Sequence, residues 1–160
     1  MRIYKSMVRP SIEYCSPVWG GACETQLAAL DAVQRRAVRI IKDSDLTNSL
    51  HSLQHRRDAA DLSLFHRYYH GDCSVELHQQ VPPPKVFNRA SRSATRSHSL
   101  VVEDPQCTTS HFQNDFFNRT AFKWNRLDST VFSDSLPKFK RSVHKYLPNN
   151  PLARLSNQCS

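Results

Sequence analysis

Glycine is scarce in this chain of 160 residues, which has only Gly20, Gly21 and Gly71. Neither a GxGxxG nor a GxxxxGK[ST] pattern can be built from three glycines so placed, which excludes the glycine-rich loops that cradle phosphates in nucleotide-binding folds. The sequence also has no run of about 18 apolar residues, so no membrane-spanning helix is expected. The first residues form no apolar segment of the kind found in a secretory signal, and none is expected.

Cysteine pairing is not indicated either. The chain has five cysteines, an odd number, and no two of them have CxxC spacing. We therefore expect free thiols in a reducing compartment rather than a disulfide framework.

Acidic residues are scarce in the second half. Residues 1–80 hold 10 basic and 9 acidic side chains, whereas residues 81–160 hold 12 and 5, and the whole chain carries a net charge of +8. A positive field of this kind attracts nucleic acid or an anionic membrane surface and does not by itself choose between them.

Residues 24–42 show the strongest helical pattern. At about 100° per residue, the apolar side chains fall in one arc of roughly 160° and four cations fall in a separate arc of roughly 120°. If the apolar arc faces a core, the cations face solvent, and Asp31 is the one acidic neighbour, four residues before Arg35. The apolar arc comprises Leu27, Leu30, Val33, Ala37, Val38, Ile40 and Ile41, and the basic arc comprises Arg35, Arg36, Arg39 and Lys42.

Further helices are expected on both sides of this one. Residues 4–14 predict a short helix interrupted at Pro10, and Asp43-Ser44-Asp45 could cap a helix through Leu46, Leu50 and Leu53. Residues 57–70 predict a helix that ends at Gly71. After the breaker Pro82-Pro83-Pro84, residues 97–102 predict a short strand, and residues 118–127 and 136–147 predict amphipathic helices, the second capped by Ser135.

These patterns predict a mainly α protein with four to five amphipathic helices and a short pair of β-strands near residues 98–102. The predicted organisation is a helical thumb-like segment at 1–80, a linker rich in Pro, Ser and Arg at 81–99, a basic helical extension at 100–148 and a loose tail at 149–160.

Candidate catalytic groups are weak. His66, His70 and Cys73 could supply metal ligands, but they match no recognised zinc spacing and are interpreted as ordinary surface residues. A cysteine nucleophile with a histidine base would need a spatial pairing that sequence does not reveal. Three carboxylate pairs are interpreted as helix caps and loop residues: Asp43/Asp45, Asp58/Asp61 and Glu103/Asp104. The sequence thus predicts no catalytic residue, no metal and no cofactor.

Basic side chains are the better candidates for function. They recur in four sets with few acidic residues between them, which favours contacts with nucleic-acid phosphates over a merely solvated surface. Tyr68, Phe116 and Trp124 could stack on bases but are interpreted as core residues. The predicted nucleic-acid-binding residues are Arg35, Arg36, Arg39, Lys42, Arg89, Arg92, Arg96, Arg119, Lys123, Arg126, Lys140 and Arg141.

Several short motifs keep the order of a known family. Residues 3–14 read IYKSMVRPSIEY and are followed by Pro17-Val18-Trp19, and residues 30–41 read LDAVQRRAVRII. Later matches are FFNRT at 116–120, WNRL at 124–127 and LPKFK at 136–140. Together they resemble the region that follows the polymerase core in jockey-like non-LTR retrotransposon reverse transcriptases. One departure is Asp128, where that family tends to have proline.

The resemblance implies a C-terminal fragment of a retrotransposon-encoded RNA-directed DNA polymerase that contacts the backbone of an RNA or DNA template–primer. It implies an intracellular location, in the nucleus or a cytoplasmic ribonucleoprotein, and association with an upstream polymerase domain or with itself. No catalytic residue carries over, because the family's aromatic-Ala-Asp-Asp motif has no match here. The alternatives are a stand-alone helical protein-interaction module derived from a mobile element and, more distantly, a small metal-dependent enzyme.

Because that carboxylate motif is missing, we predict that the purified chain extends no primer. A primer-extension assay with Mg²⁺ should show no nucleotide incorporation above a buffer control, and incorporation above that control would contradict the prediction.

Overall fold

The computed structural model describes residues 2–47, 50–86 and 98–147 and is mainly helical, as predicted. One-turn helices that the sequence did not predict separate the longer ones. The described elements, in chain order, are the π-helix η1 (Tyr4–Val8), α1 (Arg9–Glu13), α2 (Ser16–Trp19), α3 (Glu24–Ile41), α4 (Ser44–Thr47), α5 (Leu53–Tyr69), α6 (Val75–His78), α8 (Ser110–Gln113), α9 (Phe116–Asn125), the 3₁₀ helix η2 (Ser129–Val131) and α10 (Leu136–Tyr146).

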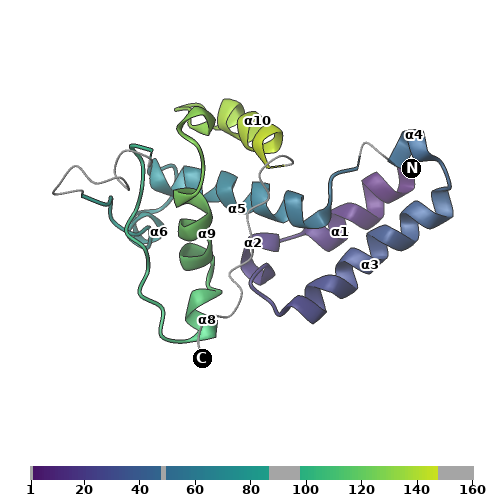
Figure 1. Ribbon diagram of the computed structural model, residues 1–160, viewed down its shortest axis with the longest axis horizontal. Coiled ribbons are helices and arrows are strands. Elements are labelled where there is room, and N and C mark those ends of the chain that lie inside the picture. The colour runs from purple at the N-terminus through teal and green to yellow at the C-terminus, as the bar shows by residue number, and fades with distance from the viewer. Residues whose placement is uncertain (1, 48–49, 87–97, 148–160) are drawn as a thin grey trace.

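Helix α5 runs through the middle of the molecule and connects its two ends (Figure 1). At one end α1 and α3 lie side by side and form an arm, and at the other α9 and α10 pack against α5. Helix α2 contacts α5 between these two ends.

The hydrophobic core lies where α5, α9 and α10 meet. Phe65 of α5, Trp124 of α9 and Phe139 of α10 are fully buried, with ring centroids 5.1 Å apart for Phe65 and Trp124 and 5.6 Å apart for Trp124 and Phe139. The indole nitrogen of Trp124 donates a hydrogen bond to the carbonyl of Leu100 at 2.7 Å. The segments 1–80 and 100–148 therefore contribute to one shared core on either side of the proline breaker.

A buried ionic network joins α5 to α9. The carboxylate of Asp61 accepts from Arg119 Nη2 at 3.4 Å and from Lys123 Nζ at 2.9 Å, and Lys123 also reaches Asp58 Oδ1 at 2.7 Å. The interpretation of Asp58 and Asp61 as a helix cap is wrong: both are buried inside α5, three residues apart, and so lie on the one helix face that meets α9.

The same arginine holds α2 in place. Arg119 Nη2 also donates to the carbonyl of Pro17, and Nη1 donates to the carbonyl of Asn114 at 3.0 Å. The chain passes so close here that a Cβ on Gly21 would lie 2.1 Å from Asn114 O. Glycine at this position allows the chain after α2 to approach Arg119 and Asn114.

The predicted strand pair near residues 98–102 is wrong. The described residues contain one isolated antiparallel bridge, between Pro84 and Val102. Prolines 82–84 have no N–H donors, so this ladder cannot extend. The other edge of Val102 is occupied by a side chain: the amide of Asn125 accepts from Val102 N at 3.0 Å and donates to Val102 O at 2.9 Å.

Helix boundaries differ from prediction at two places. Leu53 does not continue the helix capped near Asp43; it begins α5, because the side chain of Ser52 accepts from His55 N at 3.1 Å and caps a new helix. Pro10 does not interrupt the first helix, which passes from η1 into α1 with the proline in its first turn. Gly71, with φ of 76°, follows the last residues of α5 as predicted.

Histidines fasten α5 to the second half of the chain. His55 Nε2 and His144 Nδ1 form a hydrogen bond of 2.9 Å, and His66 Nε2 donates to Ser133 O at 2.8 Å. His98 Nε2 donates to Trp124 O at 3.0 Å. The interpretation of His66 as a surface residue is therefore wrong, since it is buried under α10 beside Phe139.

We predict that Asp61→Asn lowers the free energy of unfolding by about 3–5 kcal/mol, because it leaves buried Arg119 without its carboxylate. Chemical denaturation would measure the loss. The matched control is Asp134→Asn, the same change at an exposed carboxylate, which should cost less than about 0.5 kcal/mol. Equal stabilities for the two variants would contradict a supporting role for the network.

We predict that acid weakens the fold. Burial is the main factor that lowers the pKa of His55, from 6.5 to about 4, with the nearby charges of His51, His144 and Arg56 adding to it. Burial also lowers the pKa values of His66, His98 and His144. Between about pH 6.5 and 4 the unfolded chain binds protons that the folded chain does not, so stability should be full above this window and decline within it.

The measurement is the denaturation midpoint at about pH 7 and pH 5. His55→Gln should show a smaller drop between the two pH values than the unaltered chain. The control His111→Gln, at an exposed histidine, should keep the full drop. A midpoint that does not depend on pH over this range would refute the prediction.

Candidate nucleic-acid interface

Four predicted cations form a continuous exposed surface on α3. Arg35, Arg36, Arg39 and Lys42 are all exposed, and within the part of the chain that the structure describes none of them forms an ion pair. Lys42 ends the helix in a left-handed conformation with φ of 52°, and its N–H bonds to Val38 O at 3.2 Å. We call these four residues the α3 basic face.

Asp31, the expected partner of Arg35, is engaged elsewhere. Its carboxylate accepts from Arg57 Nη2 at 3.1 Å, and the side chain of Arg57 is buried between α3 and α5. The same Arg57 nitrogen donates to Gln54 Oε1 at 3.1 Å. Asp31, the one acidic residue at i, i+4 spacing from Arg35, therefore neutralises a cation on another helix instead of Arg35.

A hollow of about 680 Å³ lies beside this face, between α3 and the first residues of α5. Arg35 and Arg39 form part of its lining, with Gln34, Val38 and Ser52 among the other residues. Its volume is within the range of ligand-binding clefts. Two guanidinium groups thus stand at a concave surface rather than on a convex one.

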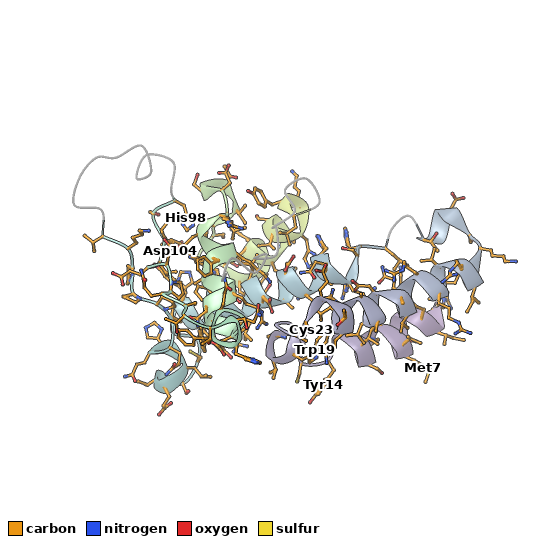
Figure 2. The ribbon with its side chains drawn as sticks, turned by 60° about the horizontal axis from the view of Figure 1, so that its bottom comes forward. Met7, Tyr14, Trp19, Cys23, His98 and Asp104 are labelled. Atoms are coloured by element: carbon orange, nitrogen blue, oxygen red, sulfur yellow. The ribbon has the colours of Figure 1, made fainter. Side chains whose placement is uncertain are left out.

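The apolar side of α3 is only partly covered, so the expectation that this arc faces a core holds only in part. Leu27 is buried, whereas Val33 and Ile40 are 39% and 71% exposed. On the neighbouring η1, Met7 is 67% exposed, and Figure 2 shows its side chain and that of Tyr14 pointing away from the rest of the molecule. The arm therefore presents apolar side chains as well as cations.

The other predicted cations are dispersed. Arg119 and Lys123 lie in the buried ionic network, where Asp58 and Asp61 neutralise them, so they offer no free charge at the surface. Arg126, Lys140 and Arg141 are exposed but lie on α9 and α10, away from α3. The predicted residues Arg89, Arg92 and Arg96 lie outside the described residues.

Of the three aromatic candidates, Trp124 is a core residue, as interpreted from the sequence, Phe116 packs partly buried against the core, and Tyr68 is half-buried outside the core cluster. Trp124 is fully buried. The ring of Tyr68 packs against those of Phe116 and Phe117, with centroids 5.9 and 5.7 Å away. Asp128, where the resembled family tends to have proline, caps η2 by accepting from Thr130 N at 3.1 Å.

Two further cations, Arg56 and Arg67, were not predicted from the sequence. Arg56 and Arg67 of α5 line a groove with Lys140 and His144 of α10. The available signal was the spacing of Arg56, Ala60, Ser63 and Arg67, which places them on one face of a helix. That spacing is a weak signal, because it alternates charged residues with small ones instead of forming a basic stripe.

Metal binding has no support in the described ranges. Within residues 2–47, 50–86 and 98–147, no group of three or more His, Cys, Asp or Glu side chains is placed to hold a metal ion. Over the same ranges Cys15, Cys23 and Cys73 are free thiols. Among the helices of these described ranges, none combines the length and the apolar composition needed to span a membrane.

No similar protein was found that could be compared with this candidate interface. Comparison with protein-family models, with curated proteins and with solved structures produced no match to this chain.

Proposed function

We propose that this chain binds the phosphate backbone of a nucleic-acid template–primer through the α3 basic face, as the C-terminal part of a retrotransposon-encoded RNA-directed DNA polymerase. It binds without regard to base sequence and has no catalytic centre of its own. Phosphate contacts of this type hold a duplex in position and leave reading of the bases to other groups.

One observation carries the proposal: the four cations of the α3 basic face are exposed and form no ion pair among the described residues. The carboxylate expected to pair with Arg35, that of Asp31, is paired with Arg57 instead. A solvated helix face usually alternates charges of both signs at i and i+4 spacing. Here the neighbouring carboxylate, that of Asp31, also lines the hollow but is paired with Arg57. The hollow admits a ligand to the guanidinium groups of Arg35 and Arg39. Arginine is well suited to this role because its planar fork matches phosphate oxygens.

The sequence resemblance supports the polymerase context. Its motifs keep their order from residue 3 to about residue 147, and one of them, LDAVQRRAVRII, includes three of the four cations of the α3 basic face.

A protein-interaction module is the second candidate function. The uncovered apolar side chains on the arm, among them Met7, Val33 and Ile40, favour it. Apolar side chains gathered at one surface commonly mark contacts between proteins. On this alternative the cations of α3 surround the contact and touch no phosphate.

The test is the salt dependence of binding to a template–primer duplex. Replacing Arg35, Arg36 and Arg39 together by glutamine should reduce the slope of log K against log salt by about 2–3 units if each arginine meets one phosphate. Circular dichroism should not change, because glutamine is a good helix former and the three side chains are exposed.

The matched control removes three positive charges elsewhere, as Lys5→Gln, Lys138→Gln and Lys145→Gln, all at exposed positions. It should retain most of the slope. If the slope of log K against log salt falls by the same amount in both triple variants, the attraction comes from net charge and not from the α3 basic face. If the arginine variant binds as tightly as the unaltered chain, the interaction module is the better explanation.

A further inference from the structure

A second groove lies between α5 and α10, on a different part of the molecule from the α3 basic face. It has a volume of about 380 Å³, and none of Arg35, Arg36, Arg39 and Lys42 lines it. The α5 wall extends from Arg56 to Arg67, which at 1.5 Å per residue is about 16 Å. Its middle is lined by the small side chains of Ala59, Ala60 and Ser63, which leave the space open.

The walls of this groove carry an excess of positive charge. Arg56 and Arg67 come from α5 and Lys140 comes from α10, whereas Glu13 is the one carboxylate among the lining residues. Arg56 donates to that carboxylate through Nε and, at 2.8 Å, through Nη2, so these two charges neutralise each other. The excess positive charge of the groove therefore comes from Arg67 and Lys140. Lys140 is exposed and pairs with no carboxylate among the described residues.

Three histidines lie where α10 meets the start of α5. His144 lines the groove and bonds to His55 at 2.9 Å, and the ring of His51 stacks on that of His55 with centroids 4.3 Å apart. Burial lowers the pKa of His144 most, followed by the charges of His51, Arg56 and Lys140. An anion in the groove would offset the neighbouring positive charges and would therefore favour the protonated form of this imidazole.

We propose that this groove binds a phosphate group, held by Arg56, Lys140 and His144, with an apolar part of the same ligand lying over Ala59 and Ala60. Arg56 contributes the guanidinium nitrogen that Glu13 does not use, and Lys140 contributes a mobile ammonium. The shared chemistry is a phosphate ester, and its source is either a small nucleotide or the backbone of a nucleic acid. The site does not depend on the α3 basic face, and each can fail without the other.

The measured quantity is the pKa of the His144 ring, determined by NMR on the whole chain. The probes are inorganic phosphate, adenosine monophosphate and a short oligothymidine strand, each compared with sodium chloride at the same ionic strength. Binding should raise the pKa of His144, because a nearby phosphate favours the imidazolium form. The charged and titratable groups near this ring are His55, which bonds to it, and His51, Arg56 and Lys140, whose charges lower its pKa. Glu13 of α1 lines the same groove.

Lys140→Gln tests the site without disturbing the fold, because the side chain is exposed. It should weaken phosphate binding about tenfold, as expected for the loss of one charged hydrogen bond. The matched control is Lys138→Gln, an exposed lysine on the same helix that does not line the groove, and it should bind as the unaltered chain does.

The probes also distinguish the sources. An oligothymidine strand that shifts His144 at lower concentration than inorganic phosphate does identifies the backbone of a nucleic acid, and a response limited to phosphate and adenosine monophosphate identifies a small phosphate ester. The variant with Arg35, Arg36 and Arg39 changed to glutamine should retain the response of His144 to inorganic phosphate. No shift of His144 with any probe, or equal binding by Lys140→Gln and Lys138→Gln, would overturn the proposal.

Discussion

The carboxylate of Asp61 is the constraint on which the rest of the molecule depends. It lies buried between Arg119 at 3.4 Å and Lys123 at 2.9 Å, and Asp58 supplies the second charge that Lys123 needs. Buried charges are stable only when they are matched, so α5 and α9 can pack in essentially one register. Because Arg119 also bonds to the carbonyl of Pro17, the network fixes α2 and positions the start of the arm.

The same network determines which basic residues remain available to a ligand. It neutralises Arg119 and Lys123, so they are not available to a ligand. By contrast, the pair of Arg57 with Asp31 leaves Arg35 without its expected acidic partner. Helix α5 is central to both effects, since it carries Asp58, Asp61 and Arg57. It has one face in the core with α9 and α10 and another along the groove of Arg56 and Arg67. Free positive charge is thereby concentrated at α3 and at the α5–α10 groove.

Local patterns predicted much of the secondary structure. The apolar and basic arcs of residues 24–42 gave the bounds of α3 to within one residue, and Gly71 marked the end of α5 because a left-handed residue suits glycine there. Leu136 to Leu147 predicted α10 and its buried Phe139 and Val143. Local sequence could not show that no strand pair forms near residue 102, because the backbone of Val102 bonds on one side to the side-chain amide of Asn125, more than twenty residues away.

By itself the sequence determined the helical class, the excess of positive charge and the two-sided character of α3, since all three depend on composition or on spacing within one helix. Only the tertiary structure decided which charges are neutralised. An ion pair such as Arg119 with Asp61 joins residues 58 positions apart, and no local periodicity indicates it. The groove between α5 and α10 is likewise a product of packing, because Arg56 and His144 become neighbours only when the two helices fold against each other.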